Sequence, residues 1–294
     1  MQLFTDDYFH IGAAHLGSGL PCQDYALSGS DGNMAYAIVS DGCSSGARTD
    51  VGARIVAHSA EVATLEHWKR MKNATAENAA HEIDLHQQVL LTSSKVNLGL
   101  VQRDLLATSL YGYFSPQGGI VHVRGDGVIA FLHTDGLLEL RRYEWNQNMP
   151  LYPAYFEDNF TAFANAHRLE EDRALTEETW TYRAARGFYC SARLARSVKA
   201  GIHGVTTNLE RSMMNEVAFI AVLTDGVTQV EGIDWKDAVV SLMSFKSVAG
   251  SFAKRRMIRF IKDAQKNGKG PLDDIAYAVI RVEKEEEVHV TENR

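Results

Sequence analysis

Two stretches far apart in the chain end in the same chemical groups. Residues 35–42 read AYAIVSDG and residues 217–226 read VAFIAVLTDG, so each apolar run stops at a hydroxyl residue, an aspartate and a glycine. An apolar run of this kind predicts a buried strand, and the glycine permits a sharp turn or a close approach. If the two ends meet in space, Asp41 and Asp225 form a carboxylate cluster of the kind that hard divalent cations prefer.

Three further acidic positions lie in tight turns or beside predicted strands. Asp24 follows Gln23, Asp126 stands between two glycines, and Asp273 with Asp274 follows a Gly-Pro break. One Asp-Gly pair is usually only a turn. Several aspartates at strand ends are a stronger signal, and together they predict a metal site.

The elements that must position these aspartates are strands and helices in separate runs. Hydrophobic spacing predicts helices over 51–71, 76–100, 235–248 and 251–265. It predicts strands over 9–14, 34–40, 105–114, 119–124, 128–133, 137–143 and 275–282, besides the strand that leads to Asp225. The stretch between 144 and 205 is polar and irregular, with a weak helix near 162–174.

Hairpin-linked strands with segregated helices indicate an α+β protein rather than a parallel doubly wound sheet. We expect a four-layer α-β-β-α sandwich with two mostly antiparallel central sheets. No linker divides the chain, so residues 1–294 are expected to form a single domain. A variable irregular segment at about 144–205 and a charged tail at about 283–294 complete the expected organisation.

Composition narrows the functional classes. Hydrophobic residues make up 45% and charged residues 23% of the chain, which is ordinary for a globular protein. The net charge of -7 argues against nucleic-acid or anionic-membrane partners. No apolar stretch approaches the roughly 20 residues of a membrane span. Three cysteines without a CxxC pair favour a reducing compartment, so we expect a cytoplasmic protein.

The order of the acidic motifs resembles that of the metal-dependent protein serine/threonine phosphatases of the 2C type. The resemblance runs from about residue 10 to residue 282 and looks most like a divergent bacterial branch. Its short motifs are Gln23-Asp24, Asp41-Gly42, Ala107-Thr108-Ser109, Gly125-Asp126, Asp225-Gly226 and Asp273-Asp274.

This resemblance implies a chemistry. Asp41, the carbonyl of Gly42, Asp225 and Asp273 would hold two Mn²⁺ or Mg²⁺ ions about 4 Å apart. Asp126 matches an optional third-metal position, and Asp24 would act mainly through metal-bound waters. Asp41 and Asp225 would be catalytic through a metal-bridging water that attacks phosphorus. The implied substrate is phosphoserine or phosphothreonine in a protein, and a serine/threonine kinase is the implied signalling partner.

The chain departs from the family where substrate is handled. Gly19 stands where many members carry a phosphate-binding arginine, and Arg48 is a possible substitute. Cys43 stands where some members carry a histidine that acts as general acid. A catalytically weak pseudophosphatase that binds or regulates partners therefore stays open. An unrelated α+β protein with chance Asp-Gly turns is the third reading.

One predicted helix is strongly basic. Lys254, Arg255, Arg256, Arg259 and Lys262 all lie in the helix expected over 251–265. Such a face is usually solvated and occasionally a docking surface.

Overall fold

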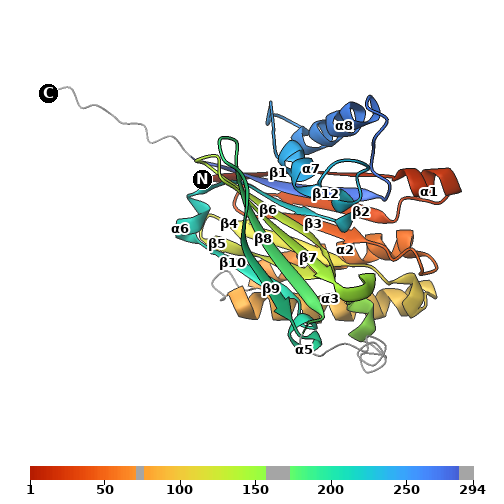
Figure 1. Cartoon of the computed structure of the whole chain (residues 1–294). Coiled ribbons are helices and arrows are strands. Elements are labelled where there is room, and N and C mark those ends of the chain that lie inside the picture. Colours follow the sequence, from red (N-terminus) through yellow and green to blue (C-terminus); the bar gives the residue numbers. More distant parts are fainter. Residues whose placement is uncertain (71–75, 157–172, 285–294) are drawn as a thin grey trace.

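Two antiparallel β-sheets form the centre of the molecule (Figure 1). The computed structural model describes residues 1–70, 76–156 and 173–284. The seven-stranded sheet contains, in spatial order, β1 Gln2–His10, β12 Ile275–Glu283, β11 Val217–Leu223, β6 Gly127–His133, β7 Leu138–Trp145, β8 Leu175–Arg183 and β9 Gly187–Arg196. The five-stranded sheet contains β10 Val205–Glu210, β5 Gly118–Arg124, β4 Ser109–Ser115, β3 Ala35–Asp41 and β2 Asp24–Ser30.

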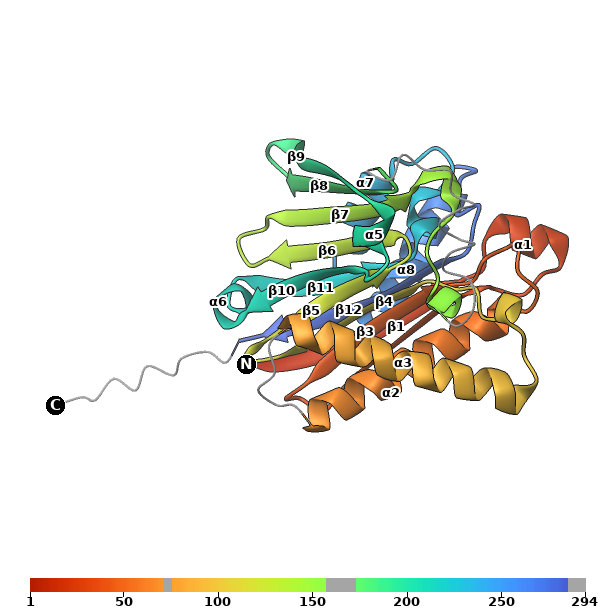
Figure 2. The ribbon, with the colours of Figure 1, turned by 90° about the horizontal axis from the view of Figure 1, so that it is seen from below.

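Helices cover the outer face of each sheet, which confirms the expected four-layer α-β-β-α sandwich (Figure 2). α2 Thr49–Arg70 and α3 Ala76–Leu98 pack on the five-stranded sheet, and α7 Trp235–Leu242 and α8 Phe252–Gln265 pack on the seven-stranded sheet. The short helices are α1 Ala13–Ser18, α5 Val198–Gly201 and α6 Arg211–Met214, and the 3₁₀ turns are η1 Gln102–Asp104, η2 Asn146–Asn148, η3 Pro153–Phe156 and η4 Asp225–Thr228.

The two matched apolar runs are central strands buried on both faces. In β11, Ile220 and Val222 enter the core between the sheets, whereas Ala221 and Leu223 pack under α7 and α8. In β3, Val39 faces the other sheet and Ile38 faces α2. Because successive side chains point to opposite faces, a strand covered on both sides needs an uninterrupted apolar run.

The start of the chain differs from the predicted elements. A strand was expected over 9–14, but β1 ends at His10 and α1 begins at Ala13. The strand β2 was missed, because Ser28-Gly29-Ser30 has the composition of a turn. These small residues fit there because β2 is an edge strand and the ring of Tyr36 fills the space beside Gly29. Two predicted elements are also too long: β4 begins at Ser109 rather than at 105, and α7 ends at Leu242.

The segment expected to be irregular contains regular structure. β8 and β9 form an antiparallel hairpin that extends the seven-stranded sheet, and β10 adds to the other sheet (Figure 2). The hairpin escaped prediction because β9 has no buried residue and therefore no hydrophobic periodicity. The weak helix expected near 162–174 falls mostly on residues 157–172, and most of the charged tail on 285–294; both stretches lie outside the described residues.

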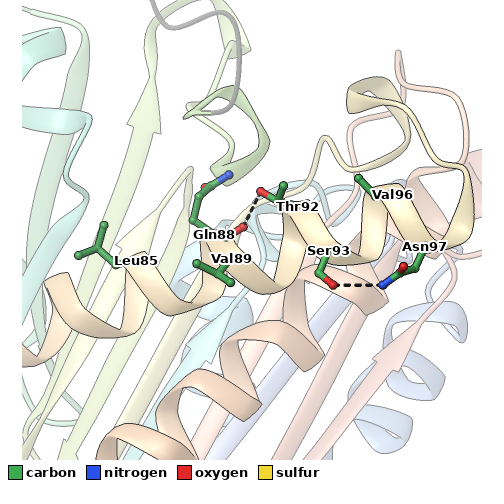
Figure 3. A pocket seen from close by; sticks show the side chains of 7 residues that line it. All are labelled: Leu85, Gln88, Val89, Thr92, Ser93, Val96 and Asn97. Carbon is green, nitrogen blue, oxygen red and sulfur yellow. Dashed lines mark hydrogen bonds between the residues drawn. The ribbon is translucent and has the colours of Figure 1, made fainter.

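α3 contacts α2 with one face and leaves the opposite face open. Leu85, Val89 and Val96 are 56%, 65% and 71% exposed, and they line a shallow hollow with uncharged polar neighbours (Figure 3).

Within the described chain, no helix combines the length and the apolarity that a bilayer span requires.

The glycines that follow the two matched strands permit close backbone contacts. A Cβ on Gly42 would lie 2.5 Å from the carbonyl oxygen of Thr49, and a Cβ on Gly226 would lie 1.7 Å from that of Asp274. Both distances are far inside van der Waals contact. These glycines therefore let the strand ends pack directly against a second segment of backbone.

We expect Gly226→Ala to lower the free energy of unfolding by about 2–3 kcal/mol, because the new methyl group collides with a backbone carbonyl. Gly17→Ala in α1 is the matched control, since a Cβ there meets nothing within 4 Å. The control should change stability by less than about 1 kcal/mol. Urea unfolding followed by circular dichroism measures both, and equal midpoints for Gly226→Ala and wild type would contradict the close approach.

Candidate metal centre at the strand ends

Three aspartates converge where the two sheets meet. Asp41 ends β3 of the five-stranded sheet, and Asp225 lies two residues beyond the end of β11 of the seven-stranded sheet, at the start of η4. Asp126 lies in the turn by which the chain passes from β5 in one sheet to β6 in the other. One carboxylate oxygen from each residue lies within 4.8 Å of the other two. The structure thus brings together the two residues that the sequence pattern paired first and adds Asp126.

A threonine side chain and main chain hold Asp41 in place. The Thr108 hydroxyl accepts a hydrogen bond from the Asp41 N–H at 2.9 Å, and the Thr108 N–H donates to the Asp41 carbonyl at 2.8 Å. The Ser40 hydroxyl donates to the Thr108 carbonyl at 2.6 Å. Thr108 is the middle residue of the Ala107-Thr108-Ser109 motif, and it fixes the backbone that carries Asp41.

The second matched hydroxyl, that of Thr224, links Asp24 to β11 and β12. It donates to the Asp24 carboxylate at 2.6 Å and accepts from the Ala276 N–H at 2.9 Å. Asp24 is 2% exposed and lies directly opposite Asp41 in the register of β2 and β3. Asp24 is therefore a buried carboxyl next to the three converging aspartates.

The turn around Asp126 is held from both sides. Gly125 and Gly127 adopt φ values of 117° and 142°, which side chains rarely tolerate, and the Trp145 indole donates to the Gly125 carbonyl at 2.9 Å. Oδ1 of Asp126 is buried and has no hydrogen-bond partner among the described residues. Desolvation of an unpartnered carboxylate oxygen costs free energy, which a bound cation or protonation of the carboxyl would offset.

Asp273 and Asp274, the last acidic pair, make different contacts. Asp274 accepts hydrogen bonds from the Gly12 and Gln23 N–H groups at 2.7 and 2.6 Å and contacts His15 Nδ1 at 2.8 Å, so its oxygens are occupied in joining chain segments. Asp273 accepts from the Gln229 amide at 2.9 Å and lies close enough to Asp225 to affect its pKa. One ligand atom each of Asp273, His15 and Asp274 lies within 4.8 Å of the other two. Asp273 is not one of the three converging aspartates.

Burial raises the pKa of each carboxyl in the cluster. Desolvation is the first cause for Asp24, Asp41 and Asp126, whose pKa values are raised well above the usual range, and the neighbouring carboxylates add to the effect. The pKa of Asp225 is raised to about 6, again first by burial and then by the charge of Asp273. The site therefore disfavours its own negative charge unless a cation is present.

The donor set suits a hard divalent cation. The three converging residues supply only carboxylate oxygens, and the orphaned Oδ1 of Asp126 needs a partner. Oxygen-only clusters favour Mg²⁺ or Mn²⁺ over soft metals. The residues present therefore fit the metal that the sequence motifs imply.

Two residues near the cluster were not predicted. Arg142 of β7 lies close enough to Asp126 and Asp225 that its charge opposes the rise of both pKa values, and its guanidinium is 3.0 Å from the Glu144 carboxylate. Tyr152 follows β7 and is 7% exposed; burial, and then Asp41 and Cys43, raise the pKa of its hydroxyl. No sequence motif singles out either residue: Arg142 is one of four charged residues in β7, and Tyr152 lies beyond its end.

The two positions where the chain departs from the family, Gly19 and Cys43, have different surroundings. Gly19 caps the C-terminus of α1 with φ of 68°, and nothing lies within 4 Å of where its Cβ would be. Arg48, the suggested substitute for the phosphate-binding arginine, precedes α2 with an exposed side chain. Cys43 is partly buried, and its sulfur lies 3.1 Å from the Ser45 hydroxyl.

Fold and site together define a layered α+β protein with an all-oxygen acidic centre at the junction of its two sheets. The sequence profile described as Protein phosphatase 2C matches residues 11–262. The chain therefore belongs to the protein phosphatase 2C family, as its motif order suggested.

Solved structures of bacterial phosphatases share the fold. The serine/threonine phosphatase of S. agalactiae is 12% identical with a TM-score of 0.54, covering 96% of this chain and 100% of its own. PstP/Ppp from Mycobacterium tuberculosis is 11% identical with a TM-score of 0.53, covering 97% and 100%. Stp1 from Staphylococcus aureus is 10% identical with a TM-score of 0.52, covering 97% and 96%. Such low identities establish the fold alone. No curated protein matches the sequence.

The raised pKa of Asp225 predicts how stability depends on pH. A carboxyl whose folded pKa is raised favours the protonated state, so its contribution is complete below about pH 4 and is lost as the pH rises through about 6. Between about pH 5 and pH 7.5, metal-free wild type should lose about 1–2 kcal/mol relative to Asp225→Asn. Urea unfolding in EDTA measures this difference, and parallel profiles for the two proteins would contradict it.

Proposed function

We propose that this protein is a metal-dependent phosphatase that hydrolyses phosphoserine or phosphothreonine in proteins. The observation that carries the proposal is the convergence of Asp41, Asp126 and Asp225 within 4.8 Å at the ends of elements from both sheets. Family membership supports the reaction class, and phosphoproteins are its expected substrates. A kinase that makes such substrates, a bacterial source and a cytoplasmic location remain predictions from the sequence.

The residues of this chain act by holding charge in a fixed arrangement. Asp41, Asp126 and Asp225 would bind Mn²⁺ or Mg²⁺, with Asp24, Asp273 and the carbonyl of Gly42 as the remaining proposed ligands or water contacts. The bound cations would polarise the phosphoryl oxygens and lower the pKa of a water molecule. Asp41 and Asp225 would therefore influence the reaction through the cations, and the number of ions, two or three, depends on Asp126.

Arg142 is our candidate for the phosphate contact that Gly19 lacks. Its charge already acts on Asp126 and Asp225, and its guanidinium lies 5.9 Å from the centre of the Trp235 ring. A planar guanidinium binds two phosphoryl oxygens at once. Arg142 therefore offers a cation beside the cluster, whereas Arg48 has an exposed side chain.

A pseudophosphatase is the second candidate. It is favoured by Gly19, which caps a helix in open space and leaves the family's phosphate contact unfilled, and by Cys43 in place of the general acid. Such a protein would keep the acidic centre and bind a cation but turn over no substrate. Metal binding and hydrolysis must therefore be measured separately.

We expect Asp41→Asn and Asp225→Asn each to lower Mn²⁺-dependent hydrolysis of p-nitrophenyl phosphate and of a phosphothreonine peptide by more than about 100-fold. Mn²⁺ affinity by calorimetry should fall with activity, because both depend on the same carboxylates. Asp237→Asn, on the exposed side of α7, is the matched control. Full activity in either cluster variant would exclude the metal mechanism, and wild type that binds Mn²⁺ without turnover would support the pseudophosphatase.

Arg142→Ala should reduce kcat/KM for p-nitrophenyl phosphate by about 10- to 100-fold, because one charge-assisted contact to the phosphoryl group is lost. Arg142→Lys should recover part of this loss, since it restores the charge but not the planar fork. Mn²⁺ affinity should stay within about threefold of wild type in both variants. Arg48→Ala is the parallel test, and a larger effect there than at Arg142 would move the phosphate contact to Arg48.

A further inference from the structure

A group of basic residues without acidic neighbours in sequence lies on one side of the seven-stranded sheet. The chain has 37 acidic and 30 basic residues, yet residues 238–262 contain no acidic residue. The same stretch contains six basic residues: Lys246, Lys254, Arg255, Arg256, Arg259 and Lys262. They lie on α8 and on the loop that joins it to α7. This separation of charge creates a positive surface that favours an acidic partner.

A small pocket lies within this surface and has an aromatic floor. It encloses about 130 Å³ and is lined by Phe245, Lys246, Ser247, Phe252, Arg255, Arg256 and Arg259. The Phe245 and Phe252 rings meet nearly edge-on with centroids 5.3 Å apart, and Phe219 of β11 lies 4.7 Å from Phe245. We call this site the α8 pocket. It is suited to an acidic side chain with an apolar neighbour.

Two arginines of the α8 pocket are oriented by neutral groups. Arg255 donates to the Ala249 carbonyl at 2.5 Å, and Arg256 donates to the Ser241 carbonyl and, at 2.6 Å, to its hydroxyl. These contacts fix the guanidinium groups without neutralising them. Burial, the first cause, and the nearby Arg259 lower the pKa of Arg256, while Tyr277 and Asp263 oppose this. A carboxylate in the pocket would relieve the unfavourable charge.

The acidic groups nearest to α8 already have partners. Asp6 accepts hydrogen bonds from the Ala253 and Lys254 N–H groups at the start of the helix, at 2.6 and 3.0 Å. Asp263 accepts from Arg259 at 2.9 Å and from Lys266 at 3.1 Å. The N-terminus of α8 is thus capped by a residue of the same chain. A ligand would therefore contact the basic side chains rather than the helix N–H groups.

The α8 pocket and the aspartate cluster lie at opposite ends of one strand. Phe219, whose ring contacts Phe245 of the pocket, lies near the start of β11. Asp225 follows six positions later, just beyond the end of the strand. At a rise of about 3.3 Å per residue, the two sites are roughly 20 Å apart. An extended peptide would need at least about six residues to reach from one site to the other.

We infer that the α8 pocket binds an acidic segment of the phosphoprotein substrate, at least about six residues from the phosphorylated residue. The identity of the segment as substrate rests on the proposed function; its acidic chemistry rests on the pocket alone. The net charge of -7 disfavours extended polyanions such as nucleic acid, whereas a short acidic run needs only the local cations. The hollow on α3 offers no comparable site, because uncharged residues line it (Figure 3).

The direct test is fluorescence anisotropy of the full chain with an unphosphorylated, labelled peptide that carries three glutamates beside a phenylalanine. Its affinity should exceed that of the same peptide with glutamines by about tenfold, and Arg255→Glu or Lys246→Glu should remove the preference. Arg211→Glu on α6 and Asp41→Asn should leave it unchanged. Equal affinity for the two peptides, or an unchanged preference in both pocket variants, would overturn the inference, as would binding of RNA or anionic vesicles in place of the peptide.

A second measurement separates the docking site from the proposed function. KM for a phosphothreonine peptide should fall about tenfold when the glutamates stand eight residues from the phosphate rather than two, and Arg255→Glu should abolish this difference without changing hydrolysis of p-nitrophenyl phosphate. Absence of hydrolysis with acidic-peptide binding intact would refute the proposed function alone. Hydrolysis without any effect of the glutamates or of Arg255 would refute the docking site alone.

Discussion

Mutual repulsion among buried carboxylates is the constraint on which the rest of this structure depends. Asp24, Asp41, Asp126 and Asp225 lie together where the two sheets meet, and burial raises the pKa of each. Desolvated like charges cost free energy, which must be offset by protonation or by a cation. The fold tolerates this cost because other contacts hold the backbone of each aspartate in place. The side chains therefore stay close together despite their repulsion.

Short polar residues and glycines provide that rigidity. Thr108 fixes both backbone groups of Asp41, and Thr224 joins the Asp24 carboxylate to β12. Gly226 allows the exit of β11 to touch the Asp274 carbonyl, whose own side chain secures the Gly12 and Gln23 backbone. Six separate segments, at residues 12, 23–24, 41, 108, 224–226 and 274–276, are thereby joined around the cluster, and a cation bound there would reinforce contacts that already exist.

Charge is also distributed unevenly over the molecule as a whole. The aspartate cluster lies at the sheet junction, whereas six basic residues lie on α8 and the loop before it, and β11 connects the two regions. Arg142 lies close enough to Asp126 and Asp225 for its charge to oppose the rise of both pKa values. A phosphorylated acidic peptide would meet a complementary charge at both regions, while a neutral or basic peptide would not.

Hairpin-linked strands with segregated helices were sufficient to predict the layered α+β fold, and the apolar runs of β3 and β11 marked strands that are buried on both faces. The local signal fails for two edge strands: β2 ends in the turn-like Ser28-Gly29-Ser30, and β9 has no buried residue. Sequence also identified the aspartates, since residue type and strand context are local properties. Only the tertiary structure decided which of them converge: Asp126 joins Asp41 and Asp225, whereas Asp274 serves as a backbone anchor. The positions of Arg142 and Tyr152 were likewise decided by how the sheets pack, because proximity across a sandwich depends on contacts between residues far apart in sequence.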